Sequence, residues 1–231
     1  IEGKLDITKI SYGVLPLLTE EYALLNSGGA LGKGVGPLLI ANKPAPHIDV
    51  QASMVAIPGR NTTAHLLFSL AYPEAKNKVF LRYYEIEDFV LADKGLGVII
   101  HENRFTYMLK GLKKIADLGD FWEKETGNPI PLGGIVIKRT IEPIIQQNVD
   151  LLIKKSIEFA YSNYPALNDF IRMHSQEMSE KVMRQHIDLY VNDYSLDLGP
   201  AGKKAVNKLL EVYSHANNLA RKPVSVFRDE L

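Results

Sequence analysis

A histidine at the end of an apolar segment is the residue best suited to proton-transfer chemistry. The segment Gly97-Val98-Ile99-Ile100 has the composition of a buried strand, and His101 follows it directly. Proteins of the α/β class collect functional groups at the carboxyl ends of their strands. An imidazole with the ordinary pKa of about 6.5 accepts a proton at cellular pH, as a general base must. A structural histidine is nevertheless more common at such a position, so the residues alone leave both interpretations open.

A polar turn followed by two hydroxyl residues could bind a carboxylate. Gly59-Arg60-Asn61 come after an apolar run, and Thr62-Thr63-Ala64 then open a helical pattern. The first turn of a helix has backbone N–H groups without helical partners, and the helix dipole favours a negative charge there. Thr62 or Thr63 could equally serve only as the helix cap. Ser11 lies in a comparable position at the end of the first predicted strand.

The glycine-rich segment from Ser27 to Gly36 does not have the spacing of a phosphate-binding loop. A Walker A loop needs glycine at the position of Ser27, and serine or threonine at the position of Gly34. A dinucleotide fingerprint that begins at Gly32 would need glycine where this chain has Pro37. We therefore predict that these glycines allow close backbone packing or flexibility.

The composition excludes several classes of partner. Lys plus Arg equal Asp plus Glu at 27 each, so no net charge attracts nucleic acid or an anionic membrane surface. No apolar run approaches the roughly 20 residues that cross a bilayer. The chain has no cysteine, and no two histidines have the i, i+4 spacing with acidic support that is typical of zinc. We therefore expect no metal, no nucleic acid and no membrane partner, whereas the oligomeric state does not follow from the sequence.

Short apolar runs alternate with helical patterns over the first two-thirds of the chain, as in α/β folds. The predicted strands are residues 5–11, 55–59, 79–84 and 97–101, and the predicted helices include 62–70 and 86–92. From Glu142 onwards the pattern is almost wholly helical, with residues 150–159 as the clearest amphipathic segment. This order predicts that a sheet positions His101 and the Thr62–Ala64 corner.

Two similar apolar segments, residues 36–43 and 131–138, bracket a unit of the size of a small lobe. We predict that the chain leaves a first lobe (1–43 and 132–231) through one segment and returns from a second lobe (44–131) through the other. Two such crossing strands would form a hinge, and a cleft between the lobes would be the ligand site. The alternative is one continuous sheet without a cleft.

Several separated motifs together resemble one family, the 1,4-dihydroxy-6-naphthoate synthases, over essentially the whole chain. They are Ser27–Pro37, Pro58–Ala64, Ile99–Tyr107, Asp117-Leu118-Gly119, Pro131-Leu132-Gly133, Tyr190-Val191-Asn192 and Ser195-Leu196-Asp197. The resemblance implies a two-lobed, periplasmic-binding-protein-like (type II) α/β fold with a helical C-terminal tail. It also implies an enzyme that acts in the cytoplasm.

The resemblance further implies a carbon–carbon lyase of menaquinone biosynthesis. Such an enzyme converts cyclic dehypoxanthine futalosine, a small carboxylated molecule, into 1,4-dihydroxy-6-naphthoate without a metal or an organic cofactor. The proton acceptor of the family matches His101. The substrate-contacting residues of the family match Lys9, Ile10, Ser11, Thr63 and Ala64.

The chain departs from the family pattern at its beginning. Family members have a further N-terminal stretch with a Ser-Pro-Cys-Pro-Asn-Asp-type motif, so we expect a segment upstream of Ile1. Two other functions remain open from the sequence. Chorismate dehydratase of the same pathway has the same fold, and a solute-binding protein would bind a small anion without changing it.

Overall fold

The computed structural model describes residues 2–174, 179–219 and 225–230. The chain divides into two compact units, Ile1–Gly32 with Pro131–Leu231 as unit 1 and Lys33–Ile130 as unit 2. Each unit has its own sheet, so the structure does not have the single continuous sheet that was the alternative. No helix among the described residues is long and apolar enough to cross a bilayer.

Unit 2 contains a five-stranded sheet with helices on both of its faces. The strand order is β6 (Lys78–Phe80), β5 (Val55–Ile57), β7 (Leu96–Ile99), β4 (Leu38–Ala41) and β8 (Lys113–Asp117). β5 is parallel to both β6 and β7, whereas β4 is antiparallel to β7 and β8. Two of the parallel pairs are Ile57 with Phe80 and Val55 with Leu96.

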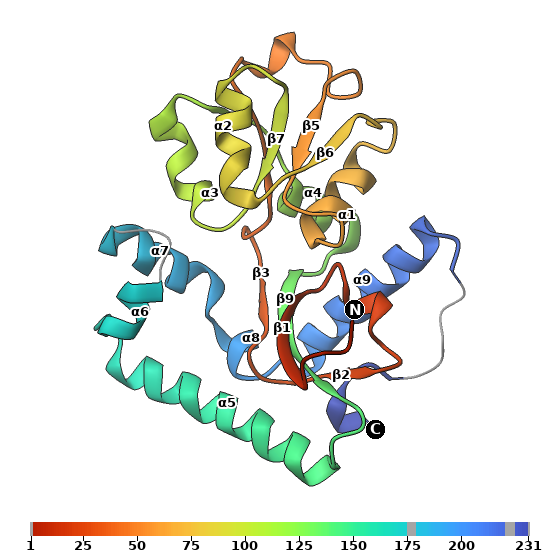
Figure 1. Cartoon of the computed structure of the whole chain (residues 1–231), viewed down its shortest axis with the longest axis vertical. Coiled ribbons are helices and arrows are strands. Elements are labelled where there is room, and N and C mark those ends of the chain that lie inside the picture. The colour runs from red at the N-terminus through yellow and green to blue at the C-terminus, as the bar shows by residue number, and fades with distance from the viewer. Residues whose placement is uncertain (1, 175–178, 220–224, 231) are drawn as a thin grey trace. The chain divides into compact units, whose positions relative to one another are not determined.

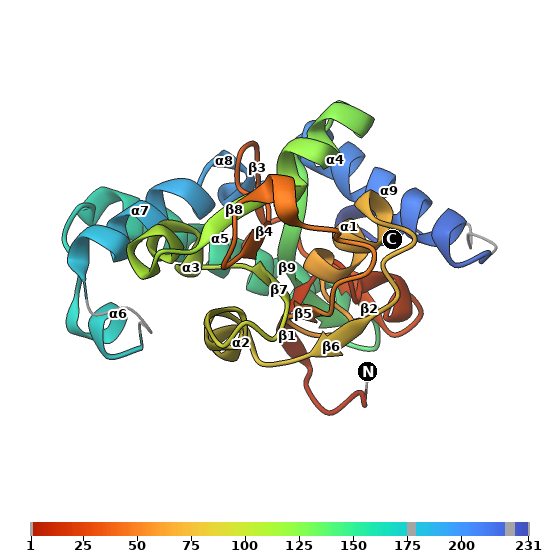
Figure 2. The same cartoon turned by 90° about the horizontal axis from the view of Figure 1, so that it is seen from above.

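The helices of unit 2 connect these strands. Figures 1 and 2 show α2 (Ile86–Leu91) on one side of the sheet, and α1 (Thr63–Ala71) with α4 (Leu118–Thr126) on the other. The connections also include α3 (Asn103–Thr106) and the 3-10 helices η2 (Ala45–His47), η3 (Tyr83–Glu85) and η4 (Tyr107–Lys110). Ile86 and Val90 of α2 are fully buried with Ile40 and Ile99 of the sheet, so apolar burial fixes this helix on the strands.

Unit 1 contains a four-stranded sheet built around β9 (Ile130–Lys138), which begins at the last residue of unit 2 (Figure 1). Strands β1 (Ile7–Ser11) and β2 (Tyr22–Leu24) are antiparallel to β9, and β3 (Ala30–Gly32) also pairs with it. The helices are η1 (Leu15–Leu17), α5 (Pro143–Asn163), α6 (Asp169–His174), α7 (Glu180–Tyr190), α8 (Asp193–Leu196), α9 (Gly199–Ala216) and η5 (Arg228–Glu230).

The glycine-rich segment packs closely in unit 1 against the motif of the C-terminal region. The hydroxyl of Ser195 donates to the Gly29 carbonyl at 2.7 Å, and the Asn192 amide donates to the Leu31 carbonyl at 2.8 Å. Asn192 also caps α8 by accepting from the Tyr194 N–H. The C-terminal motif therefore forms a capped turn that fixes the glycine-rich segment, which supports the packing interpretation of these glycines.

The first boundary between the units differs from the predicted boundary at residue 43. The segment that we expected to cross between lobes contains β4, and β4 lies between β7 and β8 in the sheet of unit 2. All four of its residues are buried, because neighbouring strands flank it on both edges. The chain instead passes into unit 2 directly after β3. The hinge and the cleft between lobes stay predictions.

Candidate functional site

The parallel strands of unit 2 place several candidate residues at one edge of the sheet. Because β5, β6 and β7 run in the same direction, their carboxyl ends meet at the same edge. His101 follows β7, the start of α1 with its cap Thr62 follows β5, and Tyr83 follows β6. The structure thus brings His101, Thr63 and Ala64 to one edge, as the sequence predicts for a site on this sheet.

His101 has an unusual backbone conformation. Its φ of 56° lies in the left-handed region, although it is not a glycine. Such a conformation costs a non-glycine residue about 1 kcal/mol or more, and it is found preferentially at functional sites. The side chain is exposed, and the N–H of Arg104 donates to the His101 carbonyl at 3.2 Å. An exposed imidazole on a strained turn is suited to contact with a ligand.

Tyr83 is a residue of this edge that the sequence analysis did not identify. Its ring meets the imidazole of His101 edge-on, with 5.2 Å between the ring centres and an angle of 73°. Burial raises the pKa of the Tyr83 hydroxyl, and the charge of Glu102 adds to this effect. Tyr83 therefore keeps its proton at neutral pH and can donate a hydrogen bond. The sequence pattern predicts a strand through Tyr84, whereas β6 ends at Phe80 and Tyr83 begins η3.

Thr62 is the cap of helix α1. Its side chain accepts a hydrogen bond from the His65 N–H at 3.1 Å and donates one to the Gly59 carbonyl at 2.8 Å. Thr63 and Ala64 lie in the first turn and are 3% exposed. Of the two threonines that could cap the helix, Thr62 does so, and Thr63 is the one that the family resemblance matches to substrate contact.

Replacing Thr62 by alanine should lower the free energy of unfolding by about 1 kcal/mol. The change removes the oxygen that accepts from the His65 N–H at the start of α1. Replacement by serine keeps a hydroxyl at this position and should retain most of the stability. Urea denaturation of both variants measures the difference, and equal losses would show that the methyl group matters instead of the hydroxyl.

His65 holds the turn before α1 in place. Its Nδ1 lies 2.7 Å from the Arg60 carbonyl, and a carbonyl only accepts, so Nδ1 carries the proton. Burial lowers the pKa of His65, and the charge of Lys78 lowers it further. The guanidinium of Arg60 lies over the Phe80 ring, 4.5 Å from its centre. These contacts fix the backbone between β5 and the helix start.

The three remaining predicted contact residues lie together on β1 in unit 1. Lys9, Ile10 and Ser11 pair with residues 135, 134 and 133 of β9. The Ser11 hydroxyl accepts from the Gly13 N–H at 3.3 Å and donates to the Leu132 carbonyl at 3.4 Å. That these residues bind the same substrate as His101, Thr63 and Ala64 stays a prediction.

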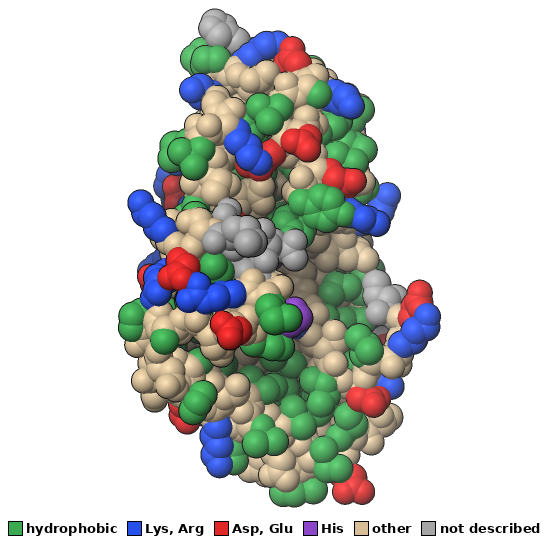
Figure 3. All heavy atoms as spheres, turned by 60° about the vertical axis from the view of Figure 1, so that its left-hand side comes forward, with side chains coloured by type: hydrophobic (Ala, Val, Ile, Leu, Met, Phe, Trp, Pro, Cys, Tyr) green, Lys and Arg blue, Asp and Glu red, His purple; other side chains and the backbone are tan. Residues whose placement is uncertain are grey.

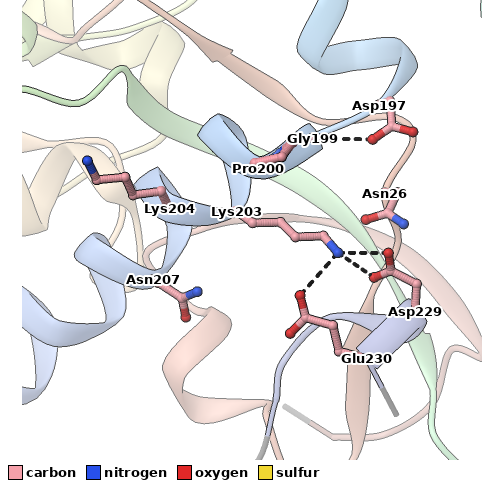
Figure 4. Close-up of a pocket in the computed structure, with 9 residues that line it drawn as sticks. All are labelled: Asn26, Asp197, Gly199, Pro200, Lys203, Lys204, Asn207, Asp229 and Glu230. Atoms are coloured by element: carbon pink, nitrogen blue, oxygen red, sulfur yellow. Dashed lines mark hydrogen bonds and ion pairs between the residues drawn. The ribbon is translucent and has the colours of Figure 1, made fainter.

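A separate pocket of about 690 Å³ lies in unit 1 and contains none of the predicted site residues (Figure 4). Its lining consists of Asn26, Asp197, Gly199, Pro200, Lys203, Lys204, Asn207, Asp229 and Glu230. The Lys203 ammonium donates to Asp229 at 2.7 Å and to Glu230 at 3.1 Å, so it ties the end of the described chain to α9. These bonds give Lys203, Asp229 and Glu230 a structural role.

The described surface has mixed charge and an apolar region on α5. Basic and acidic side chains are interspersed on the face in Figure 3, and hydrophobic side chains gather in the part of the view that contains α5. Ile144, Leu152 and Phe159 of this helix are more than half exposed.

Among the described residues, no group of three His, Asp or Glu side chains could hold a metal ion.

Solved structures show which fold the two units form. A protein from Archaeoglobus fulgidus is 30% identical to this chain with a TM-score of 0.86, covering 94% of this chain and 81% of its own. A Candida albicans protein, described as having the generic periplasmic binding protein fold, has 11% identity and a TM-score of 0.62. That match covers 95% of this chain and 75% of the other. The predicted periplasmic-binding-protein-like α/β fold is confirmed.

A family model described as menaquinone biosynthesis matches residues 1–215. Two curated relatives named 1,4-dihydroxy-6-naphthoate synthase are both 40% identical to this chain. The relative from Thermus thermophilus aligns over 210 residues, which are 90% of this chain and 76% of its own. The relative from Streptomyces coelicolor aligns over 215 residues, which are 90% and 75% of the two chains. The chain therefore belongs to the menaquinone biosynthesis family and, within it, to the family of the 1,4-dihydroxy-6-naphthoate synthases.

Proposed function

We propose that this protein is a carbon–carbon lyase that converts cyclic dehypoxanthine futalosine into 1,4-dihydroxy-6-naphthoate, with His101 as the general base. The observation that carries the proposal is the exposed imidazole at the carboxyl end of β7, held on a left-handed turn. The names of the two 40% identical relatives support the choice of reaction.

The start of α1 would bind the carboxylate of the substrate. The helix dipole and the N–H groups of the first turn stabilise a negative charge at this position. The cap by Thr62 and the His65 bond to the Arg60 carbonyl support the geometry of this turn. Thr63 and Ala64 would contact the substrate here, and Lys9, Ile10 and Ser11 of unit 1 would provide the remaining contacts.

The proposed step is a retro-aldol cleavage. His101 takes the proton of a substrate hydroxyl, and the electron pair on that oxygen forms a carbonyl group as the adjacent carbon–carbon bond breaks. The electrons of the broken bond pass to the ring system, where formation of an aromatic ring draws the reaction forward. Proton transfer and bond cleavage of this kind require no metal and no organic cofactor, and we place the reaction in the cytoplasm.

Incubation of the purified protein with cyclic dehypoxanthine futalosine tests the proposal. We expect 1,4-dihydroxy-6-naphthoate to form at a rate proportional to protein concentration, as measured by chromatography with mass detection. Chorismate should remain unchanged in a parallel incubation. Dehydration of chorismate would assign the protein to the other enzyme of the pathway. Binding of either substrate by calorimetry without product formation would instead indicate a solute-binding protein.

A further inference from the structure

The proposed reaction makes no use of a buried carboxylate in unit 2. The side chain of Glu87 on α2 is only 2% exposed. One of its oxygens, Oε2, accepts hydrogen bonds from the Asn103 amide at 2.5 Å and from the Lys110 ammonium at 2.7 Å. The other oxygen, Oε1, is buried without a hydrogen-bond partner among the described residues. A carboxylate buried at such a cost calls for an explanation.

The helix that carries Glu87 is fixed on the strand that leads to His101. Ile86 and Val90 of α2 lie directly over Gly97 of β7. A Cβ atom at Gly97 would be 2.5 Å from Cγ2 of Ile86 and 2.7 Å from Cγ2 of Val90. The glycine therefore permits the helix to approach the strand closely, and Glu87 keeps a fixed position relative to β7.

Glu87 also holds the backbone immediately after His101. Asn103, its hydrogen-bond partner, is the first residue of α3 and lies two positions beyond the histidine. The next residue, Arg104, is anchored separately, because its guanidinium pairs with Asp117 at 2.7 Å and also donates to the Gly36 carbonyl. The turn that begins at His101 is therefore anchored to α2 through Asn103, and to β8 and the segment before β4 through Arg104.

The same helical segment also contacts the imidazole itself. Tyr83 lies in η3, which runs directly into α2, and its ring packs edge-on against His101. Tyr83 thus contacts the ring of the histidine, while Glu87 holds the backbone that follows it. A left-handed conformation persists only where surrounding contacts over-determine it, and these two contacts are of that kind.

We propose that Glu87 is a positioning residue, whose carboxylate holds Asn103 and thereby orients the imidazole of His101 for proton abstraction. The inference rests on the proposed role of His101 as the base. Displacement of a catalytic group by about 1 Å lowers turnover strongly, so loss of this hydrogen bond should reduce kcat. It should change KM little, because the Glu87 side chain is buried and acts through Asn103.

Two pairs of variants test this positioning role. Glu87→Leu and Asn103→Ala each remove the hydrogen bond and should lower kcat about 10- to 100-fold. Glu87→Gln keeps an acceptor oxygen for Asn103, and Lys110→Met removes the ion pair but not this bond, so both should stay within about threefold of the wild-type kcat. The Glu87→Leu/Asn103→Ala double variant should be no slower than the slower single variant, since both changes remove one interaction.

A measurement that does not depend on turnover accompanies the kinetics. NMR of the labelled histidine rings reports the position of the His101 imidazole, because the adjacent Tyr83 ring shifts its proton resonances. We expect Glu87→Leu and Asn103→Ala to move these resonances, and Glu87→Gln and Lys110→Met to leave them near their original positions. Thermal unfolding of every variant confirms that the folded protein is compared.

The outcomes separate this inference from the proposed function. Unchanged kcat and unchanged His101 resonances in a folded Glu87→Leu protein would overturn the positioning role and leave Glu87 only a part in stability. Full activity of a His101 variant would overturn the function of the base and, with it, the catalytic purpose of the anchor. Shifted His101 resonances in Glu87→Leu would then still show that Glu87 fixes the histidine.

Discussion

Replacing His101 by asparagine should lower kcat about 100- to 10,000-fold without unfolding the protein. Asparagine adopts the left-handed conformation more readily than most residues, so it suits the φ of 56° at this position. Its amide does not accept a proton at neutral pH, and the variant therefore removes the base while it preserves the turn. Alanine would be a poorer choice, because it would add backbone strain to the loss of the imidazole.

Steady-state kinetics with cyclic dehypoxanthine futalosine and circular dichroism measure the two expectations for this variant. His215→Asn provides the matched control, because His215 is an exposed histidine near the end of α9 in unit 1. The control should keep the kcat of the wild type. Wild-type turnover in His101→Asn would show that His101 is not the base, and Tyr83, whose titratable ring packs against it, would be the next residue to replace.

The position of His101 could be predicted because local sequence determines it. The apolar run before the histidine forms strand β7 almost as expected, and the hydroxyl residues at 62 and 63 begin a helix that differs from the prediction by one residue at either end. Strand composition and helix capping act over a few residues. The sequence therefore indicates both the end of β7 and the start of α1, which lie at the same edge of the sheet.

The sequence predicts that Tyr83 lies in a strand, because five of the six residues from Val79 to Tyr84 are apolar or aromatic. Strand β6 instead ends at Phe80, and the carboxylate of Glu85 accepts from the Arg82 N–H at 2.8 Å to begin a 3-10 helix. Arginine is not among the usual capping residues, so this helix start had a weak signal. The early end of β6 and the start of η3 place the Tyr83 ring beside His101. The composition of the segment did not indicate this change from strand to helix.

Long-range contacts account for the other differences between prediction and structure. Strand β3 is only three residues long, and it is fixed by Asn192, whose amide reaches the Leu31 carbonyl from far along the chain. The hydrogen bond between Glu87 and Asn103 likewise joins α2, which precedes β7 in the chain, to α3, which follows it. Periodicity describes which face of an element is buried, but it does not identify partners across such distances.

Replacing Gly36 by alanine should lower the free energy of unfolding by about 3 kcal/mol. A Cβ atom at this position would overlap the Cα and the amide nitrogen of Gly119 in the first turn of α4. These are backbone atoms that cannot rotate away, so the segment that leads into β4 must move away from α4. The Gly36 carbonyl also accepts from Arg104, and the variant should therefore disturb the turn after His101 as well.

Gly34→Ala is the matched control for Gly36→Ala, because it adds the same methyl group two residues earlier. Gly34 has a φ of 67°, and a Cβ atom there would meet open space, so only backbone strain of about 1 kcal/mol is expected. Urea denaturation of both variants compares the two costs directly. Equal losses at the two positions would contradict the close approach of Gly36 and Gly119, whereas a much larger loss at Gly36 would establish that this glycine is required for packing against α4.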